Sequence, residues 1–393
     1  MRILYIALSC GPNLGSEDAV GWNIPLEALR FGHDVTVLTR SDKRKEIEGY
    51  IAKNPDISYP KFIYRELPRL ATYCKGPLYS IRAKMWCTAI SRELPALCQK
   101  LHFDVVHQIT PVEFRSIVDM AEIYSLKVVG PMGGGGEIAP VFQRAYLRVR
   151  DRIVEMFRSI SNKNAVRSRA LKKSLVSHDV VFASNQETKA IIQEMGWKGP
   201  LIVQSEVAAK RLVARAPKNG RGFVIGAAGR LHYGKGYLFL LDVIASMNVP
   251  DLELRIAGEG PDRSRIETRI QELGLQDTVK LLGRLSYHEM EEFYADLDVF
   301  AFPSFREATG TVLIEAMAAG VPVVAFDAFG AHEILYNKAH SSLVSFKKEL
   351  NQIIFSFSKA LLNSTFIPNV PPKTWNEYTK YLLYCYQFYL DKK

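Results

Sequence analysis

The stretch "FPSFREATGTVLIEAMAAGVPVVAF", residues 302–326, contains the end of one apolar run, a loop, a helix-forming segment and a second apolar run. The first run, residues 299–304, ends in a loop that carries Glu307, and the helix that follows is expected to stop at Gly320. The second run, residues 321–326, begins directly afterwards. Apolar runs without polar alternation, separated by a helix, are typical of parallel strands covered on both faces. The stretch therefore predicts two strands of a parallel sheet with a helix between them.

The same alternation of apolar runs and helical segments extends along the whole chain. The expected strands are residues 2–8, 34–39, 104–109, 127–131 and 179–184 in the first half, and 223–229, 252–258, 279–283, 299–304 and 321–326 in the second. With 393 residues and 48% hydrophobic content, the chain is long enough for two cores. We predict an α/β fold of two doubly wound domains.

The domain boundary is expected where periodicity is weakest. Residues 206–222, "EVAAKRLVARAPKNGRG", collect basic residues, Pro and Gly. We therefore predict an N-terminal domain over 1–205, a linker over 206–221, a C-terminal domain over 222–372 and a final helix over 373–393. Ligands of such sheets bind beyond the carboxyl ends of the strands, so two facing domains would form a cleft there.

Cysteine usage and hydropathy favour a cytoplasmic protein. The five cysteines, Cys10, Cys74, Cys87, Cys98 and Cys385, show neither zinc-site spacing nor the density of a disulfide scaffold. The first residues, "MRILYIALSC", resemble a signal peptide, but the apolar run Ile3 to Leu8 is short and we expect a first strand instead. No stretch approaches the roughly 18 to 20 apolar residues of a spanning helix.

The net charge of +10 is concentrated in residues 144–173, where ten Lys and Arg face only Asp151 and Glu155. Apolar residues recur there at roughly helical spacing: Tyr146, Leu147, Ile153, Met156, Phe157 and Ile160. One interpretation is that this face docks on an anionic membrane surface while the arginines meet headgroups. The other is a solvated helix whose apolar stripe packs on its own domain. Nucleic acid is not expected, because no recognition motif accompanies the charge.

A glycine-rich turn follows the expected strand of residues 223–229. "GRLHYGKGY", residues 229–237, has the spacing of a P-loop as far as Lys235. A P-loop then needs a Ser or Thr hydroxyl for magnesium, but this sequence has Gly236. The segment is therefore predicted to be a phosphate-binding strand-to-helix turn of another kind.

Loops after the early strands are further candidates. Gly15 and Ser16 precede a helix expected to begin near Glu17, where backbone N–H groups can bind an anion, although tight turns use the same residues for geometry alone. Gly133 to Gly136 are costly to fix, which favours close approach of the backbone to a ligand or to another chain segment over a flexible loop. His107 alone would be a core residue, but its place at a strand end favours a function.

Two further observations concern nucleotides. In "IAGEGPDRSRIE", Gly258 and Gly260 resemble a dinucleotide fingerprint, but Arg263 occupies the third glycine position. Hydride chemistry is therefore poorly supported.

Glu315 lies in the helix after Glu307. A carboxylate near a buried face is costly unless it has hydrogen-bond partners, and two ribose hydroxyls would provide them. The backbone N–H groups at the positive end of the same helix suit a diphosphate; they belong to Gly310, Thr311 and Val312.

Glu307 and Glu315 are separated by seven residues, and this pair with "EAMAAGVPVVA" resembles the retaining glycosyltransferases of family 4, which have the GT-B fold. The resemblance covers nearly the whole chain, because its motifs occur in the family's order: "GSEDAVGWN", "GHDVTVLTR", "FDVVHQIT", "GPMGGGGE", "GRLHYGKGY", "IAGEGP", "VKLLGRLS" and "PSFREATG". It implies that the final helix packs back on the N-terminal domain, with its aromatic residues in the core.

The resemblance also implies a role for each site residue. Arg230 and Lys235 would grip the donor diphosphate without a metal, Glu307 would contact the donor sugar and Glu315 the ribose. The implied catalytic set is His107, beside the transferred sugar, with Arg230, Lys235 and Glu307. The remaining donor contacts are Gly15 at the phosphates, the backbone near Arg284 at the base, and the first-turn amides of Gly310, Thr311 and Val312; the acceptor side holds Ser16, Glu17, Gly133, Gly134, Gly135 and Gly136.

One departure puts the donor-sugar contacts in doubt: Ala331–His332 stands where the family commonly has a Gly-Pro type of sequence. The first hypothesis is a retaining, metal-independent and cofactor-free glycosyltransferase that moves a sugar from a UDP- or GDP-sugar to a glycan or lipid-linked acceptor in surface polysaccharide biosynthesis. It would act in the cytoplasm or on the inner face of the membrane. A nucleotide-sugar epimerase of the same fold is the alternative among enzymes. A noncatalytic nucleotide-sugar-binding subunit of a glycan assembly complex is the alternative from another class.

Overall fold

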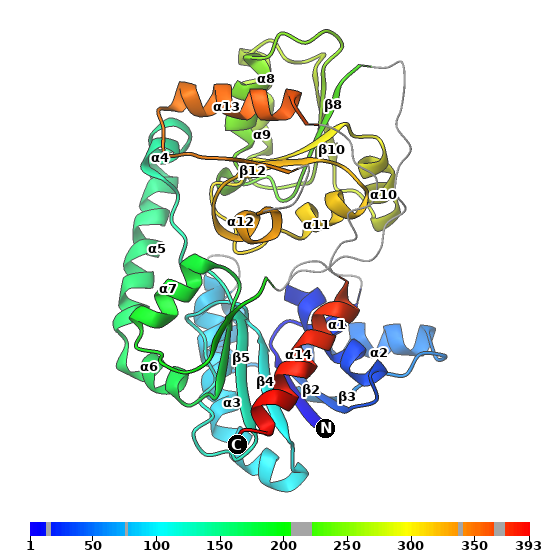
Figure 1. Ribbon diagram of the computed structural model, residues 1–393, viewed down its shortest axis with the longest axis vertical. Coiled ribbons are helices and arrows are strands. Elements are labelled where there is room, and N and C mark those ends of the chain that lie inside the picture. The colour runs from blue at the N-terminus through cyan, green and yellow to red at the C-terminus, as the bar shows by residue number, and fades with distance from the viewer. Residues whose placement is uncertain (13–16, 75–77, 206–221, 337–340, 365–373) are drawn as a thin grey trace. The chain divides into compact units, whose positions relative to one another are not determined.

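The computed structural model describes residues 1–12, 17–74, 78–205, 222–336, 341–364 and 374–393, and the chain divides into two compact units (Figure 1). The first comprises Met1–Gly135, Ile160–Val207 and Thr374–Lys393, and the second Gly136–Ser159 and Ala208–Lys373. Each unit has its own parallel sheet. The predicted linker, residues 206–221, lies outside the described residues.

The first unit contains a seven-stranded sheet in the order β3-β2-β1-β4-β5-β6-β7. Its strands are β1 (Arg2–Ala7), β2 (Asp34–Arg40), β3 (Lys61–Arg65), β4 (Val105–Thr110), β5 (Leu126–Met132), β6 (Val180–Ala183) and β7 (Leu201–Val203). Its helices are α1 (Glu17–Arg30), α2 (Arg44–Lys53), α3 (Tyr79–Leu101), α6 (Arg169–Val176), α7 (Gln186–Glu194) and α14 (Trp375–Leu390). The expected first strand is confirmed as β1, and every pairing in this sheet is parallel.

The second unit contains a six-stranded sheet in the order β10-β9-β8-β11-β12-β13. Its strands are β8 (Val224–Ala228), β9 (Glu253–Ala257), β10 (Val279–Gly283), β11 (Val299–Phe302), β12 (Val323–Phe326) and β13 (Ser341–Val344). Its helices are α4 (Pro140–Tyr146), α8 (Tyr237–Ala245), α9 (Arg263–Glu272), α10 (Tyr287–Ala295), α11 (Thr311–Ala318), α12 (Phe329–Leu335) and α13 (Leu350–Leu362). The helix α5 (Val149–Arg167) begins in this unit and ends in the first.

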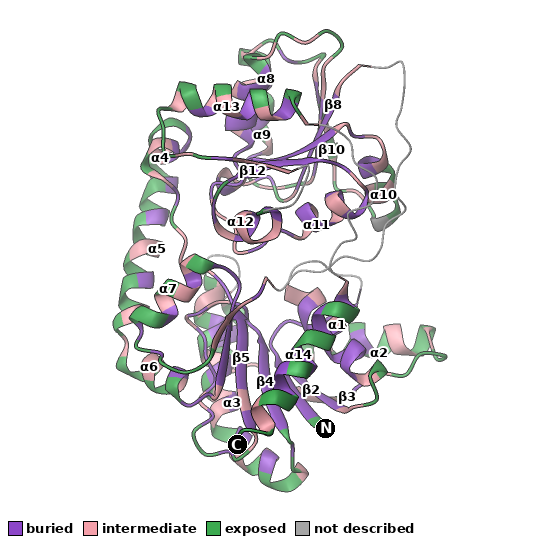
Figure 2. Cartoon of the chain, viewed as in Figure 1, coloured by how far each residue is buried: buried purple, intermediate pink, exposed green. Residues whose placement is uncertain are grey.

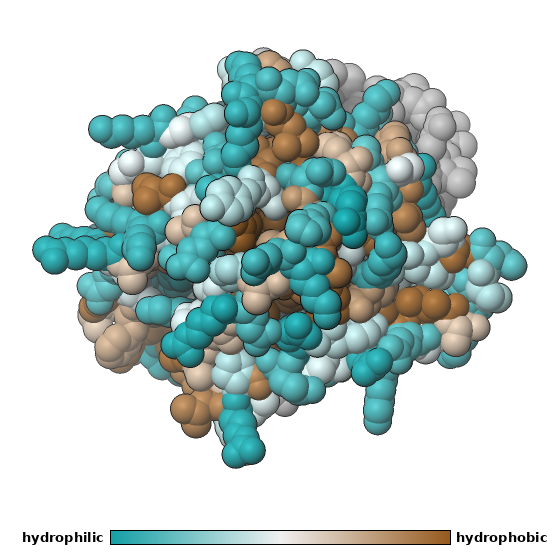
Figure 3. Space-filling model, turned by 90° about the horizontal axis from the view of Figure 1, so that it is seen from below, coloured by the Kyte–Doolittle hydropathy of each residue, from teal (hydrophilic) through white to brown (hydrophobic). Residues whose placement is uncertain are grey.

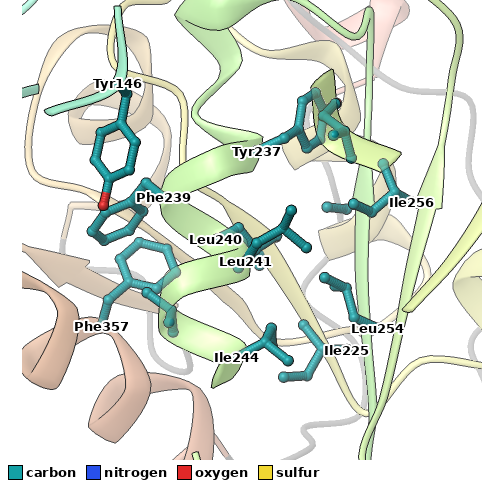
Figure 4. Packing of buried hydrophobic residues seen from close by; sticks show 14 of the residues in the cluster. Tyr146, Ile225, Tyr237, Phe239, Leu240, Leu241, Ile244, Leu254, Ile256 and Phe357 are labelled. Atoms are coloured by element: carbon teal, nitrogen blue, oxygen red, sulfur yellow. The ribbon is translucent and has the colours of Figure 1, made fainter. Parts of the chain in front are cut away.

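The strands of both sheets are mostly buried, as Figure 2 shows. In the second unit, one core cluster joins α8, α9 and α13 to one face of the sheet, and another joins α10, α11 and α12 to the other face. Figure 4 shows the first cluster, in which Leu240 and Leu241 of α8 face the strand residues Ile225 and Leu254. Phe239 lies beside the rings of Tyr146 and Phe357. Helices on both faces explain why the strands read as continuous apolar runs.

Residues 136–159 require a correction, because the sequence placed them in the N-terminal domain and they belong to the second unit. The physical reason is aromatic packing. The ring of Phe142 stacks on Phe305 with centroids 4.2 Å apart, and the ring of Tyr146 meets Phe239 edge-on. Tyr146 also donates a hydrogen bond of 2.8 Å to Asp242 on α8. A segment that contributes rings to a core is held there by their large buried area.

The C-terminal helix α14 packs against α1 and β5 of the first unit. Its residues Tyr378 and Tyr386 are fully buried, whereas Tyr384 is exposed. Across the described ranges, no helix combines the length and apolar character that crossing a bilayer requires. The face drawn in Figure 3 is mainly hydrophilic with hydrophobic side chains between the charged ones, which is ordinary for a protein surface.

Candidate functional site

The second unit carries the main candidate site at the point where its strand order reverses. The chain runs outward from β8 through β9 to β10, and then returns to add β11 on the other side of β8. The loops after β8 and β11 therefore start side by side and lead to opposite faces of the sheet, which leaves a crevice at their carboxyl ends. These two loops carry Lys235 and Glu307.

The Lys235 ammonium and the Glu307 carboxylate form an ion pair across this crevice. Both side chains are partly exposed, and the Lys235 ammonium also lies 5.6 Å from the centre of the Phe302 ring. In the absence of a ligand each charge thus satisfies the other. An anion that bound Lys235 would compete with Glu307 and release its carboxylate for a hydroxyl group.

Glycines allow the loops to approach one another backbone to backbone. Gly236 has φ +70°, and a Cβ built there would lie 2.0 Å from the carbonyl oxygen of Pro303. A Cβ at Gly258 would lie 2.0 Å from the carbonyl oxygen of Gly229, and one at Gly260 would lie 2.3 Å from that of Leu231. The "GEG" of residues 258–260 therefore packs against the β8 loop, which explains these glycines without a dinucleotide.

Glu315 lies in the second turn of α11, where Tyr294 of α10 donates a hydrogen bond of 2.8 Å to its carboxylate. Burial raises the pKa of Glu315, and the Tyr294 hydroxyl offsets part of that shift. The N-cap residue Gly310 supplies no side-chain cap, so the amides of Thr311 and Val312 mark the positive end of the helix. The first turn of α11 therefore suits an anion, and the Glu315 carboxylate beside it suits a hydroxyl group of a ligand.

Glu315→Gln is expected to stabilise the protein at neutral pH while weakening nucleotide binding. Because the folded-state pKa is raised, the unfolded chain loses this proton at a lower pH than the folded protein does. The carboxylate therefore lowers the free energy of unfolding once the pH exceeds the unfolded pKa of about 4.3. The melting temperature of the variant should exceed that of the wild type at pH 7 and match it below about pH 4. The exposed Glu292→Gln provides the control.

Glu155 of α5 connects the two loops of the crevice. This buried carboxylate accepts a hydrogen bond of 2.9 Å from the hydroxyl group of Tyr233 in the β8 loop, and it forms an ion pair with Arg306 in the β11 loop. Arg306 directly precedes Glu307 and Tyr233 lies two residues before Lys235. Glu155 is therefore a positioning residue for the pair. Neither of these two contacts was foreseen from the sequence, because Glu155 lies in a segment interpreted through its basic charge.

Glu155→Gln is expected to loosen both loops. Hydrogen bonds to a charged group contribute about 1.5 to 3 kcal/mol, so thermal unfolding should reveal a loss of about 2 kcal/mol. The KM for the donor should rise about tenfold with a smaller change in kcat, because loop placement is disturbed and the binding groups are intact. Glu272→Gln on α9, an exposed partner of Arg269, is the matched control. An unchanged KM would remove Glu155 from its positioning role.

Arg230 and Arg284 lie just beyond the carboxyl ends of β8 and β10, and both side chains are exposed. Their contacts with a diphosphate and a base stay predictions.

In the first unit, Gly15 and Ser16 fall outside the described residues. Glu17 lies at the equivalent reversal of strand order, between β1 and β4.

Glu17 bridges the loops of the first unit. Its carboxylate accepts hydrogen bonds from the Ser9 hydroxyl at 3.3 Å, the Tyr79 hydroxyl at 2.5 Å and the Val112 amide at 3.1 Å. Burial raises the pKa of Glu17, while the Tyr79 and Val112 bonds act in the opposite direction. Glu17 thus holds three segments together at the carboxyl edge of the sheet, and its assignment to an acceptor site stays a prediction.

His107 requires a correction. Its side chain has no solvent exposure, its Nε2 lies 2.6 Å from the carbonyl oxygen of Gly130, and its Nδ1 bonds to the hydroxyl group of Tyr386. Burial lowers its pKa to about 3, so the ring is neutral at physiological pH. Both ring nitrogens are occupied within the core, and His107 presents no group to a sugar. The sequence interpretation failed because Tyr386 lies 279 residues further along the chain.

Two of the four glycines closely meet other chain segments. A Cβ at Gly135, where φ is +84°, would lie 2.1 Å from the side chain of Ile191, and one at Gly136 would lie 2.5 Å from the ring of Phe329. The division between the units falls between these two glycines. Phe329, the first residue of α12, itself has φ +53°, a strained conformation for a bulky residue. The next residue, Gly330, donates its N–H to the Glu307 carbonyl oxygen at 3.3 Å.

Two doubly wound units, with a cation, an acidic partner and a helix N-terminus at the strand reversal of the second, form a GT-B fold. Residues 210–368 match the model of the family described as glycosyl transferases group 1. This match covers 159 of the 393 residues and lies within the second unit.

Relatives with assigned functions match part of the chain. The 2-deoxystreptamine glucosyltransferase of Streptomyces kanamyceticus is 34% identical over 116 residues, which is 29% of this chain and 30% of that protein. The lipopolysaccharide core biosynthesis glycosyltransferase LpsD of Rhizobium meliloti is 29% identical over 160 residues, which is 39% of this chain and 46% of that protein. The matched region thus spans less than half the length of either relative.

Solved structures match the whole chain in fold. Sucrose-phosphate synthase from Thermosynechococcus elongatus aligns over 100% of both chains with a TM-score of 0.67 and 16% identity. Anabaena HepE in complex with UDP-glucose aligns over 98% of this chain and 100% of its own, with a TM-score of 0.58 and 17% identity. At this level of identity the likeness establishes the fold.

Proposed function

We propose that the protein is a retaining, metal-independent hexosyltransferase that uses a UDP- or GDP-sugar. Its acceptor would be a glycan or lipid-linked molecule in surface polysaccharide biosynthesis, such as O-antigen, capsule or exopolysaccharide, made on the cytoplasmic side of the membrane. The observation that carries the proposal is the Lys235–Glu307 pair at the strand reversal of the second unit. The lipopolysaccharide role in the name of LpsD and the UDP-glucose bound to HepE support the acceptor and donor classes.

The chemistry of the residues suits departure of a nucleotide diphosphate. As the bond between sugar and phosphate breaks, negative charge accumulates on the diphosphate, and Lys235, Arg230 and the first turn of α11 would stabilise it. By analogy with oxyanion holes, each such group contributes about 3 to 4 kcal/mol in a site that excludes water. Glu307, released from Lys235 by the diphosphate, would orient a sugar hydroxyl. An acceptor hydroxyl attacking from the side of the leaving group would retain the anomeric configuration.

The test is a screen of the purified protein against UDP-, GDP-, ADP- and dTDP-sugars with EDTA present, read by thermal shift and by mass spectrometry. We expect one nucleotide to stabilise the protein and one of its sugars to be slowly hydrolysed or transferred, with NMR of the first product showing the donor's anomeric configuration. Glu307→Gln should keep the nucleotide-dependent stabilisation and lose the turnover.

The other outcomes identify the alternatives. Interconversion of the free nucleotide sugar would indicate an epimerase. Nucleotide binding together with a biological activity that Glu307→Gln leaves unchanged would indicate a noncatalytic subunit.

A further inference from the structure

The helix α5 is polar on its buried side and apolar on its exposed side. Asp151 and Glu155 are buried against the second unit. The opposite side presents a stripe of apolar side chains that are 45% to 66% exposed: Val149, Ile153, Met156, Phe157 and Ile160. At 3.6 residues per turn these five positions fall on one face, nearly opposite the two acids. Figure 2 shows exposed and buried residues alternating along this helix.

The buried face is fixed by charge, so the helix cannot turn its apolar stripe inward. Asp151 pairs with Arg148 at 2.8 Å, and Arg148 in turn pairs with Asp262 at 2.9 Å. Glu155 pairs with Arg306. Rotation would leave these buried acids without partners, which costs about 3 to 5 kcal/mol for each broken pair in other proteins. The interpretation that the whole apolar stripe packs on its own domain is therefore wrong; of the interleaved residues, only Tyr146 and Leu147 are buried.

Basic residues border the stripe on both sides. On the helical projection, Arg150 lies to one side of the stripe and Arg152 to the other, and both side chains are exposed. Arg144, in the preceding helix α4, is also exposed. A protein partner would need acidic groups placed to meet each arginine, whereas a layer of anionic headgroups offers negative charge at every position around the stripe. The pattern is that of helices that lie in the interface of a bilayer.

We propose that the stripe of Val149, Ile153, Met156, Phe157 and Ile160 docks on the surface of an anionic lipid bilayer. The apolar side chains enter the boundary between headgroups and acyl chains, while Arg150 and Arg152 remain among the headgroup phosphates. The proposal rests on the exposure and charge of α5 and is independent of the transferase activity.

The test is co-sedimentation of the full chain with phosphatidylcholine vesicles, alone or mixed with phosphatidylglycerol. Wild-type protein should bind the anionic vesicles and lose binding in high salt. The double variants Ile153→Ser/Phe157→Ser and Arg150→Glu/Arg152→Glu should each lower the partition coefficient at least about tenfold. Matched controls should bind like wild type: Phe355→Ser/Leu362→Ser on the exposed side of α13 and Lys45→Glu/Lys53→Glu on α2.

Folding and donor turnover separate this proposal from the proposed function. The stripe variant Ile153→Ser/Phe157→Ser should keep the wild-type melting temperature. Every variant should turn over a soluble donor at the wild-type rate, because none of these residues belongs to the crevice. Arg150→Glu also removes the 3.6 Å ion pair between Arg150 and Asp151, so the charge variant is compared by turnover alone. As a second readout, Phe157→Trp should show a blue-shifted emission only with anionic vesicles. Equal sedimentation of wild type and stripe variants would overturn the proposal. So would a concentration-dependent complex that the stripe variants disrupt without any vesicle effect, since this would assign the stripe to a protein partner.

Discussion

Lys235→Ala is expected to lower donor turnover about 10²- to 10³-fold while the protein stays folded. The lysine lies in the loop after β8, at the strand reversal, and loss of one preorganised group at a developing negative charge costs about 3 to 4 kcal/mol in transition-state stabilisation. Nucleotide affinity should fall less than kcat, because the charge on the diphosphate is largest when the sugar departs. Steady-state kinetics of donor hydrolysis and calorimetric binding of the nucleoside diphosphate measure the two effects.

Lys280→Ala is the control for this substitution. Lys280 on β10 also pairs with a carboxylate, that of Glu253, at 2.8 Å, but it lies along an edge strand outside the crevice. Its loss should change turnover less than twofold, since an exposed pair contributes only about 0.2 to 1 kcal/mol to stability. If Lys235→Ala were as active as Lys280→Ala, the phosphate-binding role of the β8 loop would be refuted.

Gly236→Ala is expected to have the largest effect on stability. Two costs add: a left-handed φ of +70° costs an alanine about 1 to 2 kcal/mol, and its Cβ would overlap the backbone carbonyl oxygen of Pro303 at 2.0 Å. The carbonyl belongs to the start of the Glu307 loop and cannot rotate away as a side chain would. We expect a total loss of about 4 kcal/mol or more, which lowers the melting temperature by roughly 10 °C.

Gly274→Ala separates the two costs. Gly274, just after α9, has nearly the same φ of +67°, but a Cβ built there meets nothing within 4 Å. This variant should therefore lose only the conformational part, about 1 to 2 kcal/mol. Equal losses in the two variants, measured by urea unfolding, would mean that the Gly236 loop gives way and that its close packing on Pro303 does not position Lys235.

The sequence predicted ten strands, and all ten are present, but three further strands within the described ranges were missed. These are β3, β7 and β13, and each lies at an edge of its sheet. Their residues are mostly half-buried, because an edge strand has a neighbour on one side only. Central strands are covered on both faces and read as continuous apolar runs. The missed edge strands β3 and β13 mix polar and apolar residues, and β7 has only three residues, whereas the edge strand β10 was predicted.

Part of the candidate site was likewise predicted from the sequence, and part was missed. The β8 and β11 loops were predicted from local signals, namely glycines, a lysine and a glutamate directly after a strand. The side chains that hold those loops in place by hydrogen bonds come from distant segments. Glu155 lies 78 residues before its partner Tyr233, and Tyr294 lies 21 residues before Glu315. Such contacts have no spacing rule, and for this reason Glu155 was read only as part of a basic segment.

The fold class, the central strands and the charged loops at their ends follow from local signals in the chain, because burial periodicity and turn chemistry are local properties. Which polar groups are available depends on contacts between distant segments. It buried His107 between Gly130 and Tyr386, moved residues 136–159 into the second unit and turned the acids of α5 inward. The physical reason is that a buried polar group must find a partner, and that partner is chosen by proximity in space rather than by position in the sequence.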